Sequence, residues 1–278
     1  MSLSEPERFE VHVDVTSAAD RAPPLLSQRT GLTVGQIKSA MTKGAVWITR
    51  SGHVQRLRRA GRALHAGDQL HLYYDANVLA QEPPEPALVA DKGDYSVWHK
   101  PYGLRSQGSK WGDHCTLVRW AEQRLTPQRN AFTVHRLDRA ASGLMLVAHS
   151  KRCAATLSAL FAERRIDKQY RAVVVGAFVP DALPLRIDAP LDGKPAASVV
   201  IAAHVHTDKQ CTDVELRIET GRKHQVRRHL AALGYPIAGD RLYGQSSEDD
   251  IDLQLTAYRL AFTCPMNDAL VVFELPCA

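Results

Sequence analysis

The sequence has few of the features that mark secreted, membrane-embedded or metal-bound proteins. Its five cysteines are an odd number without a CxxC pair, so neither a disulfide framework nor a zinc ribbon is expected. No apolar run approaches the roughly 18 residues that a membrane-spanning helix needs, and the first residues lack the basic start and apolar stretch of a signal peptide. We therefore expect a soluble, cytoplasmic protein with free thiols and no contact with membranes.

Common motifs for nucleotide and metal chemistry are also missing. The segment 103–110 is similar to a phosphate-binding P-loop, but its lysine and serine stand in the wrong order and no strand precedes it. His204 and His206 would share one face of a strand, as metal ligands can. No third ligand follows at a spacing that is typical of metal-binding motifs. GxSxG, HExxH and dinucleotide-binding patterns do not occur. No cluster of metal ligands is therefore evident, which argues against a metal-dependent hydrolase.

Charges of both signs are nearly balanced, with 35 Lys and Arg against 30 Asp and Glu in 278 residues. Such a small excess does not identify a nucleic-acid partner, so the distribution of the charges matters. Seven basic residues and no acidic one lie between positions 38 and 62: Lys38, Lys43, Arg50, Arg56, Arg58, Arg59 and Arg62. A solvated basic face is the more common explanation for one such run. Here the run spans a helix, a strand and a turn, which favours a surface that binds phosphates.

Three prolines divide the chain into a small and a large part. They lie in the segment 81–90, QEPPEPALVA, which shows no apolar periodicity. Because proline fixes φ and removes a backbone donor, this stretch is expected to be a linker. We predict a small α/β module at residues 1–80 and a larger domain at residues 91–278. Short strands interspersed with few helices predict an α+β fold with a mixed or antiparallel sheet for the larger domain.

Local patterns in the small part predict a helix followed by strands. Thr33 and Gln36 form a capping-box pattern, which predicts a helix that ends at Gly44. Residues 45–48 and 70–74 have the patterns of strands. The stretches LLSQRTGLTVGQIKSAMTKGAVWI and AGDQLHLYY resemble the αL-motif domain, a small RNA-binding module of ribosomal and tRNA-acting proteins. With this resemblance, we expect the following basic residues to contact RNA: Lys38, Lys43, Arg50, Arg56, Arg58 and Arg59.

The strongest feature of the larger part is the segment 134–144, VHRLDRAASGL. Asp138 lies between two arginines, directly before a turn of small residues and an apolar strand. The flanking cations favour the charged form of its carboxyl group, and an ionised aspartate suits a nucleophile or a base better than a general acid. A surface salt bridge is the default explanation for an aspartate beside an arginine. This segment alone does not overturn that explanation.

Two further segments add to the evidence. The segment 168–170 places the ring of Tyr170 at the start of a strand, 32 residues after Asp138. The segment 220–229, TGRKHQVRRH, begins a helix with a dense cluster of donors, and helix N-termini favour anions. Taken singly, Tyr170 fits an ordinary core residue and the basic helix fits a solvated face. Together the three segments form a specific constellation.

Residues 93–277 resemble the RluA-type family of RNA pseudouridine synthases. The family's motifs occur in order as KPYGL at 100–104, HRLDRAASGL at 135–144, KQYRAVVVG at 168–176 and TGRKHQVRRHLAALGYPIAGDRLYG at 220–244. Four ordered motifs, the last of 25 residues, leave chance similarity a poor explanation. The resemblance implies an isomerase that converts uridine in RNA to pseudouridine by an intramolecular transfer, without a cofactor or a metal.

The resemblance also implies roles for four residues. Asp138 matches the family's essential aspartate, and Tyr170 matches the tyrosine that stacks on the target base. Arg227 matches the arginine that pairs with the aspartate, and Arg136 matches the arginine that takes the place of the extruded base. The family usually has Thr-Ser-Gly after the aspartate where this sequence has Ala-Ser-Gly at 141–143. That change removes none of the four functional groups.

We therefore predict a monomeric RNA pseudouridine synthase that acts on structured ribosomal or transfer RNA. The alternative is an RNA-binding protein that has kept the fold without the catalysis. Intact Asp138, Tyr170 and Arg227 argue against this alternative, because a degenerate copy is expected to lose at least one of them. The motifs identify neither the RNA nor the modified uridine, since recognition depends on loop shape and flanking nucleotides.

Overall fold

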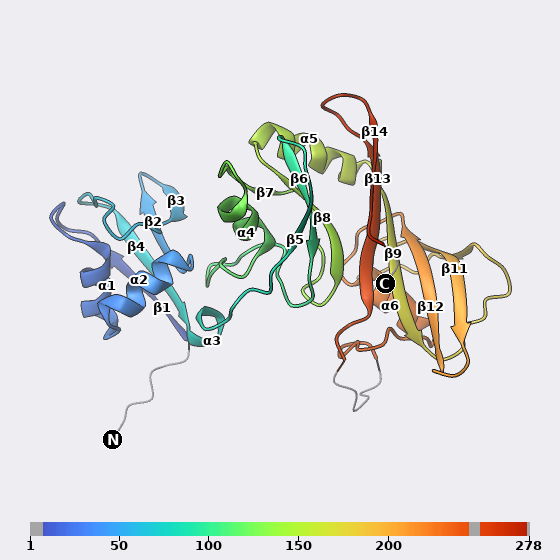
Figure 1. Cartoon of the computed structure of the whole chain (residues 1–278). Helices are drawn as coiled ribbons and strands as arrows, with labels where there is room; N and C mark the ends of the chain where they lie inside the picture. The colour runs from blue at the N-terminus through green and yellow to red at the C-terminus, as the bar shows by residue number, and fades with distance from the viewer. Residues whose placement is uncertain (1–7, 245–250, 277–278) are drawn as a thin grey trace, which may run out of the picture. The chain divides into compact units, whose positions relative to one another are not determined.

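The computed structural model describes residues 8–244 and 251–276, and its contacts divide the chain into two compact units (Figure 1). The first unit contains the chain up to Pro83 together with Gln107–Trp120. The second unit contains Pro84–Ser106 and the chain from Ala121 onward. The chain therefore passes between the units three times, after residues 83, 106 and 120.

The first unit is a four-stranded antiparallel sheet with helices packed on one face. Its strands are β1 Arg8–Asp14, β2 Val46–Arg50, β3 His53–Arg56 and β4 Gln69–Asp75, in the spatial order β1-β4-β2-β3. The helices are α1 Ala22–Thr30, α2 Val34–Thr42 and the short α3 Ala76–Leu79. Leu26 and Ile37 from the helices share a buried core with Ile48 and Leu72 from the strands. The alternation at 70–74 thus turns every second side chain toward the helices.

The predicted start of α2 is confirmed. Thr33 Oγ1 accepts a hydrogen bond from the amide of Gln36 at 3.2 Å, and Gln36 Oε1 accepts one from the amide of Thr33 at 2.8 Å. At the other end, Gly44 has a φ of 82°, which favours glycine, and its amide donates to the carbonyl of Met41.

The second unit is built on one mixed sheet. Its main path runs β10 Leu185–Ile187, β11 Ser198–His206, β12 Cys211–Ile218, β9 Asp167–Val175, β13 Leu255–Thr263, β8 Ser142–Ala148, β6 Tyr95–Lys100 and β5 Ala87–Asp91. β14 Leu270–Glu274 pairs with β13, and β7 Phe132–Thr133 pairs with β8. β13 and β8 are parallel, whereas the other pairs of strands are antiparallel. This largely antiparallel sheet with few helices confirms the predicted α+β class.

Two helices cover parts of this sheet. α5 Lys151–Ala162 begins at Ser150, whose hydroxyl accepts the amide hydrogen of Cys153 at 3.1 Å, and its Leu157 is buried in one core cluster. α6 Gln225–Ala232 buries Leu230 in a second cluster. A further helix, α4 Leu117–Arg124, crosses from the first unit into the second.

The segment predicted to be a linker is only partly irregular. Residues 87–91 form the edge strand β5, which pairs with β6. The three prolines stand at 83, 84 and 86, before this stretch, so its backbone donors are free to pair. The segment 107–120 is a second difference, since it packs with the first unit although it follows the predicted boundary.

Two further sequence-based expectations concern the cysteines and membrane spans. Cys115, Cys153, Cys211 and Cys264 are free thiols, as expected, and Cys277 lies outside the described residues. No helix in the described ranges is long and apolar enough to cross a membrane.

Candidate active site

The loop that carries Asp138 connects β7 to β8 and is fixed on both sides of this residue. Ser106 Oγ donates to the carbonyl of Leu137 at 2.7 Å and accepts the Leu137 amide at 3.0 Å. On the other side, the amide of Gly103 donates to the carbonyl of Arg139 at 2.9 Å. The Asp138 side chain, 28% exposed, is therefore presented from a constrained loop.

Lys100, the last residue of β6, lies beside the Asp138 loop, with Nζ 3.5 Å from the carbonyl of Arg139. Its side chain is fully buried, and Nζ donates to the carbonyls of Pro101 at 3.0 Å and Leu104 at 2.9 Å. Burial lowers the pKa of Lys100 to about 7, while the nearby charge of Asp138 opposes that change. The lysine of the KPYGL motif thus holds mainly its own loop, 101–104, through backbone carbonyls, and no carboxylate in the described residues pairs with it.

The turn after Asp138 requires a glycine. Gly143 has a φ of 119°, and a Cβ added to it would lie 2.3 Å from the carbonyl oxygen of Ala257 in the parallel strand β13. The close approach of β8 and β13 sets the direction of the loop that precedes them.

Tyr170 reaches the same place from the centre of the sheet. It lies on β9 opposite Leu216 of β12 and Ala257 of β13, and its side chain is buried. Burial and the nearby carboxyl group of Asp138 both raise the pKa of Tyr170. Its hydroxyl group therefore keeps its proton at neutral pH.

The beginning of α6 brings His224 to Asp138. His224 has a φ of 53°, an uncommon conformation for a residue other than glycine. Its Nδ1 lies 2.9 Å from the hydroxyl of Tyr243, and its Nε2 lies 3.7 Å from Asp138 Oδ1. Burial lowers the pKa of His224 despite the charge of Asp138, so the imidazole is mainly neutral at pH 7.

Arg227 lies one turn further along α6 and has two acidic partners. Its Nη1 is 4.0 Å from Asp138 Oδ2. Its Nε and Nη2 donate to the two oxygens of Asp240 at 2.8 Å and 2.6 Å. The main partner of Arg227 is therefore Asp240, and the predicted pairing with Asp138 is the longer of the two contacts. Asp240 also accepts the amide hydrogens of Leu242 and Tyr243.

These side chains line one pocket of the second unit. Its lining includes Asp138 from the β7–β8 loop, Tyr170 from β9 and Arg227 from α6. Arg136 is exposed at the same pocket. The further lining residues are Leu137, Ala141, Lys168, Ile218, Gly221, Arg222, His224, Gln225, Val226 and Leu255. Three motifs that lie far apart in the sequence thus converge.

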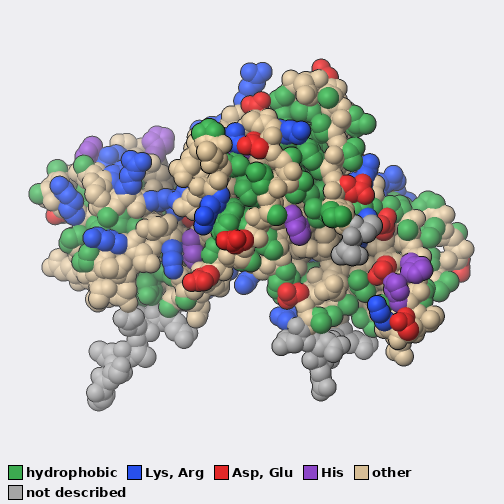
Figure 2. All heavy atoms as spheres, viewed as in Figure 1, with side chains coloured by type: hydrophobic (Ala, Val, Ile, Leu, Met, Phe, Trp, Pro, Cys, Tyr) green, Lys and Arg blue, Asp and Glu red, His purple; other side chains and the backbone are tan. Residues whose placement is uncertain are grey.

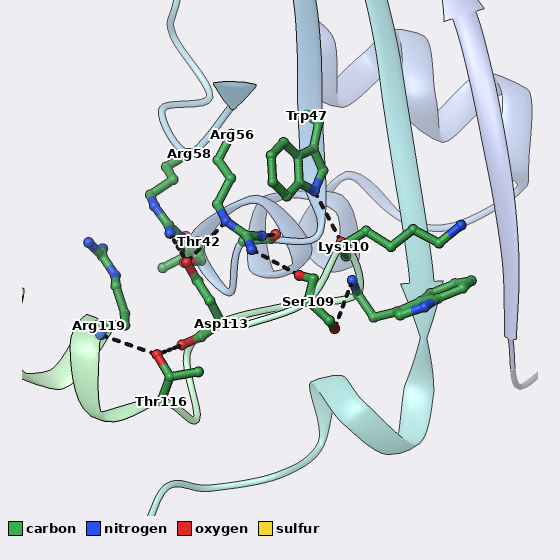
Figure 3. A network of polar contacts seen from close by, with 11 residues as sticks. Thr42, Trp47, Arg56, Arg58, Ser109, Lys110, Asp113, Thr116 and Arg119 are labelled. Carbon is green, nitrogen blue, oxygen red and sulfur yellow. Dashed lines mark hydrogen bonds and ion pairs between the residues drawn. The ribbon is translucent and has the colours of Figure 1, made fainter. Parts of the chain in front are cut away.

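The basic residues predicted to bind RNA belong to the first unit, and several have partners within it. Figure 3 shows Arg56 and Arg58 directed at Asp113, a residue of the segment 107–120. Arg56 Nε lies 3.1 Å from Asp113 Oδ2, and its guanidinium group stacks on the ring of Trp47. Both arginines therefore attach the segment 107–120 to the sheet.

Arg50 and Lys43 are also engaged, whereas two of the predicted cations are exposed. Arg50 donates to both oxygens of the buried Asp68 at 2.8 Å and 2.6 Å, and Lys43 Nζ donates to the carbonyl of Leu79 at 2.5 Å. In the space-filling view, Lys and Arg side chains lie across the surface of this unit (Figure 2). Lys38 and Arg59 are exposed and have no ion pair with a described residue.

No role was predicted from the sequence for Asp240, the partner of Arg227, or for Lys168, which lines the pocket. Asp240 and Lys168 both lie inside segments that carry the family resemblance, but no local pattern separates them from ordinary surface charges. In the described part of the chain, no three His, Cys, Asp or Glu residues gather as a metal site would require.

Comparisons with known proteins fit this geometry. A family model described as RNA pseudouridylate synthase matches residues 94–232. The dual-specificity RNA pseudouridine synthase RluA of Salmonella typhimurium is 36% identical over 211 residues, which cover 70% of this chain and 95% of the relative. RluA of Escherichia coli K12 has the same identity and coverage. An uncharacterized RNA pseudouridine synthase of Aquifex aeolicus is 27% identical over 271 residues, 86% of this chain and 84% of the relative.

The class of protein is therefore an RNA-modifying isomerase. Within that class, the chain belongs to the RluA-type family of RNA pseudouridine synthases. The predicted family is confirmed. Among solved structures, human RNA pseudouridylate synthase domain containing 1 has a TM-score of 0.58 at 24% identity and covers 71% of this chain and 86% of its own. Human RNA pseudouridylate synthase domain containing 4 has a TM-score of 0.56 at 22% identity, with 69% and 88% covered. These two structures establish the shared fold.

Proposed function

We propose that the chain converts specific uridines of a structured RNA to pseudouridine, with Asp138 as the essential group. The observation that carries this proposal is the convergence of Asp138, Tyr170 and Arg227 from three separate motifs on one pocket. A surface salt bridge would explain Asp138 alone, but it would not explain a buried tyrosine and a buried arginine at the same place.

The residue types suit the chemistry. The uracil must leave the ribose, rotate, and reattach through carbon 5 without escaping. The carboxyl group of Asp138 either adds to the sugar or takes a proton from the neighbouring carbon. Tyr170 offers a flat face to the detached base. Because its hydroxyl keeps its proton, it relays the carbon 5 proton only by passing its own proton to the carboxylate of Asp138 as it accepts the new one. Arg227 orients the aspartate through its charge.

The target uridine must leave its stack before it can enter the pocket, at a cost of a few kcal/mol. We assign Arg136 to the gap that the base leaves, because this arginine is exposed at the pocket. In the first unit we assign RNA contacts to Lys38 and Arg59, since the other predicted cations are held by Asp68, Asp113 or Leu79.

The test is an Asp138→Asn variant. The substitution keeps the shape of the side chain and removes only its charge, so turnover should vanish while folding and RNA affinity stay close to those of the wild type. Pseudouridines are mapped by carbodiimide-based sequencing in RNA from cells without the gene, complemented by wild type or by D138N. Sites restored by both proteins would contradict a role for Asp138, whether by addition to the sugar or by removal of a proton.

The same proposal covers the substrate, the cellular compartment and the oligomeric state. The substrate is ribosomal or transfer RNA, and the "dual-specificity" in the name of the Salmonella relative supports testing both. The enzyme acts in the cytoplasm, which the free thiols support. It works as a monomer, which light scattering with and without RNA would check.

A further inference from the structure

Lys168 lies in the active-site pocket without a role in the chemistry described so far. It precedes Tyr170 by two residues on β9, so both side chains lie on the same face of the sheet. Lys168 lines the pocket together with Tyr170 and Asp138. Its ammonium group is 3.8 Å from the position that a Cβ on Gly221, another lining residue, would take.

The ammonium group of Lys168 has no counter-ion. Within residues 8–244 and 251–276, no carboxylate lies within 4.0 Å of Nζ, and no hydrogen-bond acceptor is in reach. Its one close partner is the ring of Phe161, whose centroid is 5.3 Å from Nζ. By contrast, the neighbouring Arg227 is neutralised by Asp240, and Arg222 donates to the carbonyl of Pro195.

An unpaired cation in a partly buried pocket is unfavourable for the fold. Burial lowers the pKa of Lys168 to about 8, yet the group keeps its proton at neutral pH for most of the time. A methionine would fill the same space against Phe161 without this cost. Such groups in clefts are often kept for a ligand.

We propose that Lys168 contacts the substrate, and that its ammonium group binds an anionic oxygen of the target nucleotide. This inference rests on the proposed function. Two oxygens of that kind enter the pocket. One belongs to the phosphate of the flipped nucleotide. The other belongs to the uracil, because the electron pair of the nitrogen–carbon bond leaves with the base and places negative charge on its carbonyl oxygens.

The first experiment measures tritium release from RNA that carries [5-³H]uracil, since carbon 5 loses its hydrogen when it bonds to the ribose. The RNA is isolated from cells that lack this gene and is treated with wild type, Lys168→Met, Lys168→Arg and the control Lys209→Met. Lys209 is an exposed lysine in the turn between β11 and β12, at the end of these strands away from the pocket.

Lys168→Met should lower kcat/KM by about ten- to a hundredfold, as expected for a lost hydrogen bond to a charged group, and Lys168→Arg should recover part of the loss. A higher KM with unchanged kcat assigns the contact to the phosphate, and a lower kcat with unchanged KM assigns it to the uracil. A kcat/KM within about threefold of the Lys209→Met value would overturn the inference. Wild type that releases no tritium would instead contradict the proposed function.

Stability and pH dependence separate this role from a structural one. Lys168→Met should unfold at the same denaturant concentration as wild type or at a higher one, and a lower midpoint would show that the lysine serves the fold. In wild type, kcat/KM should fall as pH rises through about 8, because free Lys168 loses its proton there. In Lys168→Arg this fall should disappear.

Lys100 beside the Asp138 loop has a pKa of about 7, so a change that it causes lies at lower pH and is common to wild type and Lys168→Arg. Burial lowers the pKa of the neighbouring His135 to about 3, and it lowers that of His224 as well. The pKa values of Tyr170 and Arg227 are both raised, so these groups keep their protons near pH 8; Arg136, Arg222 and Asp138 are the other charged side chains that line the pocket. A loss of activity near pH 8 that persists in Lys168→Arg would contradict the assignment.

Discussion

The guanidinium group of Arg227 lies between two carboxyl groups, and the contacts are unequal. Asp240 takes both hydrogen bonds in a buried pair, with 4% and 0% of the two side chains exposed, whereas Asp138 lies at 4.0 Å. Asp240 therefore fixes the position of Arg227, and Arg227 in turn faces Asp138, the aspartate proposed to be essential for the reaction. A buried arginine held this way does not need the substrate to stay in position.

Replacing Asp240 should destabilise the fold. Asp240→Asn leaves the buried Arg227 without its close counter-ion and with only Asp138 at 4.0 Å, so the free energy of unfolding in urea should fall by about 3 kcal/mol. Asp192→Asn is the matched control: Asp192 pairs with Arg228, the next residue of α6, at 3.0 Å, but it is 68% exposed. The Asp192→Asn substitution should leave the urea midpoint of unfolding unchanged. Equal effects of the two variants would show that burial is not the deciding factor.

The same pair predicts a dependence on pH. Burial alone would raise the pKa of Asp240, but the hydrogen bonds from Arg227 and two backbone amides outweigh it and lower the pKa below 3.8. A lowered pKa in the folded state means that this stabilisation is present above the unfolded value and is lost as pH falls through the folded value. The difference in unfolding free energy between wild type and D240N should be constant above about pH 5 and shrink below about pH 4.

At the scale of the element, strand β8 depends on a close approach to β13. A Cβ at Gly143 would lie 2.3 Å from a backbone oxygen, and its φ of 119° strains any other residue. Gly143→Ala should therefore lower the free energy of unfolding by about 3 kcal/mol or more. Gly61→Ala is the control, since nothing lies within 4 Å of its added Cβ and its φ is not in the left-handed region. Similar urea midpoints for both variants would contradict the packing argument.

Elements with a local cause could be predicted from the sequence. The capping box of Thr33 and Gln36 depends on residues three positions apart, and α2 begins where expected. Strand β5 was missed because the prolines before it dominate the composition of the segment, although Ala87–Asp91 itself pairs without difficulty. The pairing of Arg227 with Asp240 could be anticipated only as one basic and one acidic residue 13 positions apart, across a turn that the sequence does not specify.

At the scale of the molecule, the RNA contacts proposed for the first unit have a direct test. The double variant Lys38→Ala/Arg59→Ala should reduce the slope of log Kd against log salt concentration by about 1.5, since each phosphate contact contributes about 0.7 to 0.9. The probe is total transfer RNA in a filter-binding titration. The control replaces Lys209 and Arg152, two exposed cations of the second unit. An equal slope for the double variant and wild type would remove this unit from the RNA interface.

Removing the first unit outright would be a poorer test. Asp113 and its neighbours at 107–120 pack with this unit, so a deletion would also expose Cys115 and Leu117, which are buried. This arrangement was not predictable from the sequence, because Arg58 and Asp113 are 55 positions apart and no repeating pattern connects them. The charges at 50–58 indicated a basic surface, and the structure instead gives three of them internal partners.

The attachment of the segment 107–120 also sets an order of events during translation. The first unit lacks the complete segment 107–120 until 37 residues after Pro83 have been added, which takes about 2 to 7 s at 5–20 residues per second. During that interval Arg56 and Arg58 have no carboxylate partner from this segment, while the nascent chain stands next to ribosomal RNA. In the newborn unit these two guanidinium groups are thus open to other anions, and the closure of the unit coincides with the synthesis of α4.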